Sequence, residues 1–529
     1  MSSLVPLPIV IPLLAAALSV AFAKVRMAQR ILSIGALGAS VVVSVLLLIQ
    51  ADEDGVVIMD AGGWPAPLGI TYVVDRLSAI MLVTSSAMML VVLLYAIGQG
   101  GVRHDGDPGV ESRHAAFHPI YLVLAAGVAG SFATGDMFNL FVAFEMMLAA
   151  SYVLMMLGGR GPQIRAGMTY VVISLVASAL FIAALALLYA STGTVNMADL
   201  ATRMPELSSE VRTGFSLLLI TTFGVKAALF PLFFWLPDSY PTAPGPVTAI
   251  FAGLLTKVGV YAIVRTQLLL FGGDGDGFGG SRQGTVLLVV AGCTMLVGVL
   301  GALAQDDLKR ALSFHIIGQI GYMIFGLGLF TLAGIAAVVF YIIQTILVKT
   351  NLFLVAGLVD EHVGSGRISQ VGGLARSAPV IAVFFAVPAL SLAGLPPSSG
   401  FAGKFALVDA GIGADEWWIV AIALVVSLLT LFSMTKIWAG VFWGEAEVPP
   451  PPSASVPPPT SASTVGRAGG PWLMVGATGI AVALSIAYVV WAGPIYELAE
   501  RAAADLLDPR VYVQAVLRDR TPASFGGGG

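Results

Sequence analysis

Long apolar stretches separated by short polar segments run through the whole chain. Most are close to the roughly 20 residues that an α-helix needs to cross a bilayer. Backbone polar groups in lipid must be satisfied within the segment, so the stretches predict helices. The pattern therefore predicts an all-α polytopic membrane protein with about fourteen transmembrane helices. We place them at 5–23, 31–50, 75–97, 116–134, 137–157, 168–190, 214–236, 245–267, 285–303, 308–329, 332–358, 378–410 (broken), 416–443 and 471–493.

Composition agrees with this interpretation and excludes several functions. The chain is 57% hydrophobic and 11% charged, whereas a soluble domain has about 25% charged residues. Its net charge is −4 and it has no block of basic residues, so nucleic acid is not expected as a partner. The one cysteine, Cys293, cannot by itself hold an iron–sulfur cluster, a structural zinc or a disulfide. We expect no cofactor, and any redox centre coupled to this protein would belong to another chain.

The first apolar run and the loop charges predict the topology. Ala21-Phe22-Ala23 resembles a signal-peptide cleavage site. However, Lys24 and Arg26 follow the apolar run and no basic residue precedes it, so we expect an uncleaved first span. Loops on one side of the predicted bundle hold twelve Lys and Arg residues, against five on the other side. Cytoplasmic loops are the richer in these residues, which predicts both termini outside the cytoplasm.

Ionisable side chains interrupt seven of the apolar stretches. A charge at mid-bilayer costs about 2.5–3.5 kcal/mol on insertion scales, and such residues normally mark ion or proton routes. A single buried lysine is as often a snorkelling side chain or half of a static ion pair as it is part of a transport route. Several such residues together indicate transport. The residues are Glu145, Lys226, Lys257, His315, Lys349, Lys404 and Lys436, of which Lys436 lies nearest a polar segment and is expected to snorkel.

Lysine suits proton relay because burial disfavours its charged form and a nearby carboxylate restores it. A buried lysine paired with a glutamate is therefore a two-state switch that releases or takes up a proton as the pair separates or closes. Glu145 and Lys226 are the candidate pair. Asp136, Asp238 and Asp409 lie at predicted span ends, where a solvated or helix-capping role is expected.

Two of the predicted spans contain helix breakers beside a lysine. Pro231 and Pro237 follow Lys226 in the seventh span, and "LAGLPPSSG" precedes Lys404 in the twelfth. Interrupted helices at corresponding positions of two halves are typical of inverted-repeat transporters. The predicted organisation is N-terminal helices 1–3 (1–110), a first repeat of helices 4–8 (111–267), a second repeat of helices 9–13 (285–443), a Pro/Ser-rich loop (444–470), and a last helix with a tail (471–529). Residues 494–510 are expected to form a short amphipathic helix at the surface.

The segment around these residues resembles a known family. "FGVKAALFPLFFWLPDSYPTAPGPVTAIFAGLLTKVGVYAIVR" (223–265) is similar to the core motif of the antiporter-like subunits of respiratory complex I, membrane hydrogenases and Mrp-type cation/proton antiporters. "DDLKRALSFHIIGQIGYMIFGLG" (306–328) and "LVKTNLFLVAGLV" (347–359) most resemble the D subunit of Mrp-type multisubunit Na⁺/H⁺ antiporters. The resemblance extends from about residue 70 to 445, and the chain length fits this D subunit or a middle subunit of complex I.

The resemblance implies a role for each buried charge. Glu145 would be the acid of the fifth helix, Lys226 its partner, Lys257 the central lysine, Lys404 the terminal lysine, and His315 and Lys349 the connection between centre and terminus. One departure matters, because this chain has Gln344-Thr345 where relatives often carry histidine. Glutamine orders water but carries no proton, which puts the link between Lys257 and Lys349 in question and leaves His315 as the alternative carrier.

The expected function is a proton-translocating subunit of a multisubunit Na⁺/H⁺ antiporter in a bacterial cell membrane, driven by the proton-motive force and working with partner subunits. No cluster with the ligand spacing of a hard-cation site stands out, and K⁺ or Li⁺ remain alternatives to Na⁺. Two other functions stay open. One is a proton-pumping subunit of a redox complex, and the other is a scaffold whose buried charges form static ion pairs.

Overall fold

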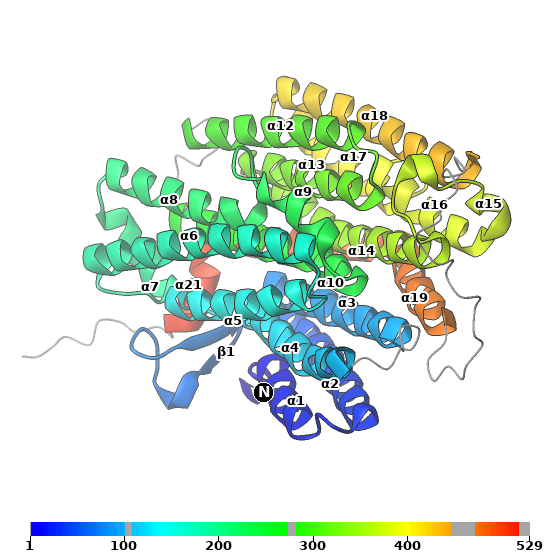
Figure 1. Cartoon of the computed structure of the whole chain (residues 1–529). Helices are drawn as coiled ribbons and strands as arrows, with labels where there is room; N and C mark the ends of the chain where they lie inside the picture. Colours follow the sequence, from blue (N-terminus) through cyan, green and yellow to red (C-terminus); the bar gives the residue numbers. More distant parts are fainter. Residues whose placement is uncertain (1, 101–107, 273–281, 446–470, 518–529) are drawn as a thin grey trace, which may run out of the picture.

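The computed structural model describes residues 2–100, 108–272, 282–445 and 471–517, which form a helical bundle (Figure 1). The first helices are α1 (Leu7–Ala21), α2 (Arg26–Glu53), α3 (Arg76–Gly100), α4 (Pro108–Ala133), α5 (Met137–Met156), α6 (Gly161–Thr192), α7 (Met197–Arg203) and α8 (Ser209–Ala227). The middle ones are α9 (Trp235–Ser239), α10 (Gly245–Ile250), α11 (Thr256–Phe271), α12 (Arg282–Leu303), α13 (Leu308–Gly328) and α14 (Leu332–Val363). The last are α15 (Leu374–Ser377), α16 (Pro379–Ala393), α17 (Ser399–Gly413), α18 (Trp417–Trp438), α19 (Pro471–Val490), α20 (Ala492–Leu507) and α21 (Pro509–Leu517).

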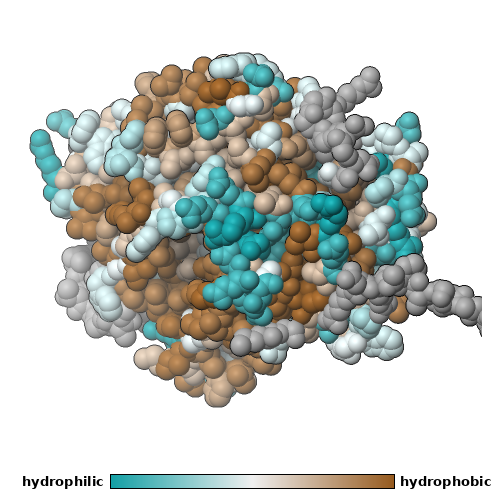
Figure 2. All heavy atoms as spheres, turned by 180° about the vertical axis from the view of Figure 1, so that it is seen from behind, coloured by the Kyte–Doolittle hydropathy of each residue, from teal (hydrophilic) through white to brown (hydrophobic). Residues whose placement is uncertain are grey.

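The predicted all-α polytopic architecture is confirmed. Among the described residues, 11 helices are long and apolar enough to cross a membrane, and α1 and α16 are shorter apolar helices. Together with the two interrupted segments around α8 and α16–α17, every predicted span falls on a helix. Hydrophobic residues cover much of the surface, with a hydrophilic patch near the middle of the face in Figure 2. A surface of this kind is suited to lipid and to partner subunits.

Three segments form the centre of the bundle. The most apolar part of the segment is 100% buried in Gly245–Phe271, 94% buried in α13 and 89% buried in α14. A helix that is apolar on all sides must be surrounded by other helices. Lys257, His315 and Lys349 lie on these segments, so three of the six predicted site residues are at the most enclosed positions.

The seventh span is interrupted as predicted. Helix α8 ends at Ala227, and Ala228 adopts a left-handed conformation with φ of 61°. Pro231 follows, and a proline has no N–H to continue the helical ladder, while Pro237 lies inside the short helix α9. The chain then forms α9 and resumes in α10. The break thus leaves Lys226 in the last turn of a helix.

The twelfth span is also interrupted. Helix α16 ends at Ala393, followed by Gly394 with φ of 83°. Helix α17 begins at Ser399, where the Ser398 side chain accepts a hydrogen bond from the Phe401 N–H. The two halves touch at Gly400, where a Cβ atom would lie 1.6 Å from the Ser391 carbonyl oxygen. Only glycine allows this approach of two backbones.

A short hairpin was not predicted. Strands β1 (Val57–Asp60) and β2 (Thr71–Val74) pair antiparallel, with Val57 opposite Val74. The segment lies between the second and third spans and was expected to be a loop. The Pro/Ser-rich loop predicted at 444–470 lies outside the described residues except for its first two, and the boundaries of the two repeats stay a prediction.

The C-terminal amphipathic helix is confirmed as α20, and it continues into α21. Together we call them the C-terminal strap (492–517). The strap contacts helices from distant parts of the chain, since α20 packs against α14, α3 and α11 and α21 packs against α7. The buried side of α20 consists of small and apolar residues, namely Ala499, Ala502, Ala503 and Leu506.

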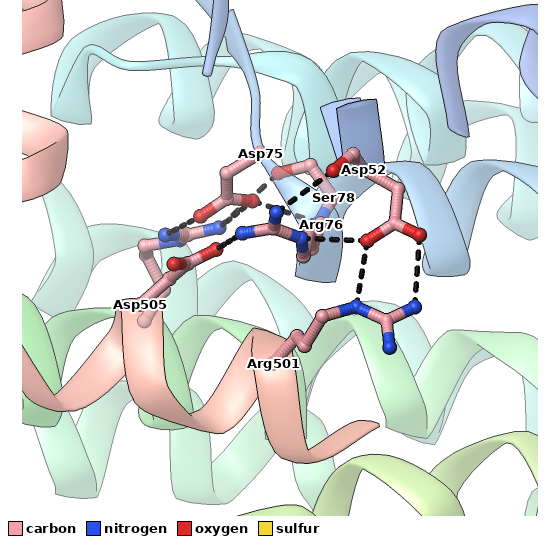
Figure 3. Close-up of polar contacts among 7 residues, drawn as sticks. Asp52, Asp75, Arg76, Ser78, Arg501 and Asp505 are labelled. Carbon is pink, nitrogen blue, oxygen red and sulfur yellow. Dashed lines mark hydrogen bonds and ion pairs between the residues drawn. The ribbon is translucent and has the colours of Figure 1, made fainter. Parts of the chain in front are cut away.

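Ion pairs fasten the strap to the ends of α2 and α3 (Figure 3). Arg501 of α20 pairs with Asp52 at 2.8 Å. Arg76 lies between the two elements, 2.8 Å from Asp52 and 2.6 Å from Asp505. Arg76 and Asp505 are largely shielded from solvent, and burial raises the pKa of Asp505 even though Arg76 faces it.

A buried pair lies beside this network. The carboxylate of Asp75 accepts two hydrogen bonds from Arg265, at 2.6 and 2.7 Å, and one from the Ser78 N–H. Burial opposes ionisation of Asp75, but the facing charge and hydrogen bonds of Arg265 outweigh it and lower the pKa of Asp75. Tyr512 of the strap lies against the same guanidinium, with its ring centroid 5.4 Å from Arg265 Cζ.

Candidate functional site

The predicted pair of Glu145 and Lys226 is joined through a third residue. Glu145 is on α5, Lys226 on α8, and Ser178 lies between them on α6. Lys226 Nζ donates to Ser178 Oγ at 3.1 Å, and the Ser178 hydroxyl donates to Glu145 Oε1. Within the described residues the lysine and the glutamate form no direct ion pair. The second partner of Lys226 Nζ is the backbone carbonyl of Ser174, at 3.0 Å.

A small cavity borders Lys226. Its lining includes Tyr170, Ser174, Trp235 and Tyr240, and it has room for about one water molecule. The Tyr240 hydroxyl is buried and has no hydrogen-bond partner among the described residues. A polar group of this kind is normally satisfied by water. The cavity thus provides a polar approach to the Lys226 ammonium.

Lys257 lies just after a π-helical segment, Phe251–Leu255, at the start of α11. Its Nζ donates to the Ala252 carbonyl oxygen at 2.6 Å, and the side chain is fully buried. Single π-helical turns are frequent at functional sites because they alter the regular hydrogen-bond ladder. Gly253 brings this turn against α14, since a Cβ there would lie 2.2 Å from Thr350 Oγ1.

Lys349 has the fewest hydrogen-bond partners of the buried lysines. Within the described residues its Nζ has no hydrogen-bond partner, and the hydroxyls of Thr256 and Thr350 have none either. The positive charges of Lys257 and Lys404 act on the Lys349 side chain. Buried donors without protein partners require water. The arrangement therefore suits a hydrated connection through the centre of the bundle.

His315 is anchored from a neighbouring helix. Its Nε2 lies 2.8 Å from Ser433 Oγ on α18, and the imidazole is buried. The charges of Lys349 and Lys404 act on it. His315 is thus buried on α13 and held by α18, and its role between the central and terminal lysines stays a prediction.

Lys404 lies at the break between α16 and α17. Its Nζ donates to the carbonyl oxygens of Leu392 and Ala393, at 2.9 and 3.3 Å, and to Ser427 Oγ at 3.1 Å. The ammonium also lies 5.0 Å from the centroid of the Tyr322 ring. The two carbonyls are at the end of α16, where no following helical N–H satisfies them. The break therefore supplies two of the three oxygen atoms that accept hydrogen bonds from Lys404.

The side chain of Gln344 lies elsewhere than expected. Its Nε2 donates to Ser391 Oγ at 3.1 Å, and its Oε1 accepts from Thr345 Oγ1 at 3.2 Å. Ser391 is in turn 2.8 Å from Ser399 Oγ. Gln344 therefore contacts the break that precedes Lys404. Its effect on the link between Lys257 and Lys349 stays a prediction.

The residues expected at span ends behave differently from the buried lysines. Asp136 caps α5 by accepting the Asn139 N–H at 2.7 Å. It is buried, however, and burial raises its pKa to about 6. Asp238 and Asp409 are exposed. Lys436 is exposed as well, and its Nζ donates to carbonyl oxygens at the end of α12, which agrees with the predicted snorkelling.

Sequence reasoning missed the hydroxyl and ring partners, namely Ser178, Ser427, Ser433 and Tyr322. One signal was available, since Ser174 and Ser178 lie one helical turn apart within an apolar run and so share a face. No group of three or more His, Cys, Asp or Glu side chains suited to a metal ion occurs in the described part of the chain.

Comparison with known proteins gives the relationship. The family described as "NADH:quinone oxidoreductase/Mrp antiporter, TM" matches residues 134–430, more than half of the chain. The Na(+)/H(+) antiporter D subunit of Alkalihalophilus pseudofirmus is 41% identical over 520 residues, which cover 98% of this chain and 100% of that protein.

Solved structures share the fold. A chain of the Mrp complex from a Dietzia species aligns with a TM-score of 0.86 and 34% identity, covering 98% of this chain and 99% of that one. A chain of the membrane-bound sulfane sulfur reductase, an archaeal respiratory membrane complex, aligns with a TM-score of 0.83 and 26% identity over 97% of this chain and 99% of that one.

Proposed function

Because the chain belongs to the NADH:quinone oxidoreductase/Mrp antiporter transmembrane family, we propose that it is the proton-translocating subunit of a multisubunit Na⁺/H⁺ antiporter. Protons moving down the proton-motive force would drive Na⁺ out of a bacterial cell. The subunit would work only with its partner subunits in the cell membrane. The observation that carries the proposal is the row of buried lysines. The ammonium groups of Lys226, Lys257 and Lys404 contact neutral oxygens, and none of the four lysines, Lys349 included, contacts a carboxylate among the described residues.

Neutral oxygen acceptors allow these lysines to exchange their protons. A carboxylate in direct contact would hold the ammonium in its charged form, whereas carbonyl and hydroxyl oxygens bind it with less energy. Burial disfavours the charge in every case. Lys226, Lys257, Lys349 and Lys404 can therefore pass a proton when a neighbour gains or loses charge. His315 and Glu145 complete the proposed proton route.

The test uses inside-out vesicles that contain the assembled complex and a fluorescent ΔpH probe. Addition of Na⁺ is expected to collapse ΔpH in the wild type and not in Lys226→Ala at equal assembly. K⁺ and Li⁺, added separately, identify the cation. Lys436→Ala is the matched control, because this lysine is exposed and lies at a span end. It is expected to leave exchange within about twofold of wild type, as for surface substitutions.

The outcomes separate the alternatives. Normal exchange in Lys226→Ala would make the buried lysine structural and would contradict the proposed route. No response to any cation in assembled wild type would favour a proton-pumping subunit of a redox complex. The likeness to a chain of an archaeal respiratory complex supports that second candidate. In that case addition of an electron donor would generate ΔpH, and this generation would require Lys226.

The sidedness of the chain is part of the proposal. The excess of Lys and Arg in one set of loops supports termini outside the cytoplasm. In that orientation the break after Lys226 and its adjoining cavity belong to the cytoplasmic half of the bundle. Labelling of a cysteine introduced at exposed Glu497 with a membrane-impermeant reagent on whole cells tests this orientation.

A further inference from the structure

The hydroxyl of Ser178 has the contacts of a proton relay. It receives a hydrogen bond from Lys226 Nζ at 3.1 Å and gives its own to Glu145 Oε1. We propose that protons pass between Lys226 and Glu145 through Ser178 Oγ and not by direct contact. The inference deepens the proposed function and rests on it, since it names a residue of the same proton route.

The transfer balances in atoms and charge. The Lys226 ammonium gives one proton to Ser178 Oγ while the O–H bond of Ser178 breaks and its proton joins Glu145. The products are a neutral amine, a neutral carboxylic acid and a serine hydroxyl that again holds one hydrogen. The reverse transfer restores the starting state. One buried and one half-buried charge are removed in the forward direction, which the low-dielectric surroundings favour.

No other described group joins these two side chains. The cavity beside Lys226 is lined by Ser174, Tyr170 and Tyr240 but not by Glu145 or Ser178. A water molecule there reaches the lysine and not the carboxylate. The other hydrogen bond of Lys226 goes to the Ser174 carbonyl, which has no proton to give. Among the described residues, the serine hydroxyl is thus the one donor and acceptor that touches both ends.

The helix positions explain why a serine serves here. Helix α6 packs against both α5 and α8, so a short side chain on α6 reaches either neighbour. Ser178 is 7% exposed, which keeps bulk water from competing for its hydrogen bonds. A serine hydroxyl also rotates freely and can present its proton to either side.

Three substitutions test the relay in the assembled complex. Ser178→Ala removes the hydroxyl, and Ser178→Cys keeps the volume but offers a weak donor. Both are expected to lower Na⁺-driven proton exchange at least tenfold. Ser178→Thr keeps a hydroxyl and is expected to stay within about threefold of wild type. The matched control is Ser131→Ala, which removes a buried hydroxyl that bonds only to its own helix, at Gly127 O.

The result that overturns the relay is exchange at the wild-type rate in Ser178→Ala. If that variant fails to assemble, wild-type exchange in Ser178→Cys overturns it equally. Loss in all three variants, Ser178→Thr included, would also contradict a hydroxyl relay and indicate packing. Absence of cation exchange in the wild type would instead count against the proposed function.

An infrared measurement keeps the two failures apart because it does not depend on Na⁺. The carboxyl band of Glu145 is identified in acid-minus-alkaline difference spectra by its loss in Glu145→Gln. It is expected at higher wavenumber in Ser178→Ala, where the hydrogen bond is gone, and at the wild-type position in Ser178→Thr. An unmoved band in Ser178→Ala contradicts the relay whatever the transported cation.

Discussion

At the residue scale, the buried lysines differ in how firmly the protein holds their charge. Lys404 Nζ has three oxygen acceptors and an aromatic ring, Lys226 has two acceptors, and Lys257 has one. Lys349 has no protein acceptor among the described residues. Each acceptor stabilises the ammonium over the amine. The number of protein acceptors is thus greatest at the two breaks and smallest at Lys349.

Asp136 gives a prediction for pH dependence. Its folded-state pKa of about 6 lies above the ordinary value of 3.8. A group with a raised carboxyl pKa binds more protons when folded, so its stabilising effect is present below pH 4 and is lost as pH rises to 6. Asp136→Asn mimics the protonated form and keeps the acceptor for the Asn139 N–H. At pH 7 it is expected to stabilise the protein by on the order of 1–3 kcal/mol.

Thermal unfolding in detergent between pH 4 and 8 checks this expectation. The difference in Tm between Asp136→Asn and wild type should grow from pH 4 to 6 and then stay constant. Asp409→Asn is the control, since that carboxylate is exposed and its removal should change Tm little at any pH. A difference for Asp136→Asn that does not vary with pH would show that burial does not raise this pKa.

Sequence located the charged residues of the site but not the groups that bind them. A lysine in an apolar run is visible because the cost of burying it is large. A serine is not, because most serines in apolar helices bond to their own backbone, as Ser40 does to Ala36 O. Ser178 differs only in turning toward two neighbouring helices. That difference depends on packing, and the spacing of Ser174 and Ser178 on one face of a helix does not tell which helices that face meets.

At the element scale, the breaks place the ends of half-helices beside the lysines. Both were predictable because prolines cluster in each segment, whereas single prolines such as Pro119 and Pro388 lie inside helices. The π-helical turn before Lys257 was not, since a one-residue change in the hydrogen-bond ladder has no fixed sequence signature. The hairpin of β1 and β2 was missed for a similar reason. Its strands are four residues each, too short for alternation to stand out.

Gly400 tests how much the twelfth-span break matters. Gly400→Ala would place a Cβ 1.6 Å from the Ser391 carbonyl oxygen, a contact that only backbone movement can relieve. The movement would displace the neighbouring carbonyl of Leu392, which binds Lys404. We expect a loss of at least about 1–3 kcal/mol of stability, as for overpacked cores, and a loss of exchange in the vesicle assay.

Gly413→Ala is the matched control on the same helix. Nothing lies within 4 Å of a Cβ at that position. Alanine there should stabilise α17 by up to about 1 kcal/mol because it restricts the unfolded chain. Equal melting temperatures for Gly400→Ala and Gly413→Ala would mean that the two half-helices are not held together through Gly400.

At the scale of the whole molecule, the C-terminal strap joins parts that are far apart in the sequence. Helix α20 packs on α14 of the predicted second repeat and on α3 and α11, while α21 packs on α7. The ion pairs of Figure 3 involve Arg501 and Asp505, in the second half of α20. A strap that contacts both predicted repeats restrains their relative movement.

Arg76 is the residue through which the strap can be loosened. Arg76→Ala removes the contacts to Asp505 and Asp52 and leaves the two carboxylates facing each other without their shared cation. Because the pair is partly buried, we expect about 1–3 kcal/mol less stability for the attachment of α20, between the values for exposed and buried pairs. Backbone amides of 492–507 should then exchange hydrogen faster, while those of α13 stay protected.

Arg510→Ala is the control that distinguishes loss of the strap's attachment from loss of one positive charge. Arg510 belongs to the same strap, but its side chain is 82% exposed and its pair with Asp508 is local. Its removal is expected to leave hydrogen exchange over 492–507 unchanged. Equal protection in Arg76→Ala and wild type would mean that α20 is held without Arg76, by its alanine-rich face on α14 and by the remaining Arg501–Asp52 pair. Faster exchange over 492–507 in Arg76→Ala alone would identify the ion pairs as the fastening between the strap and the first helices.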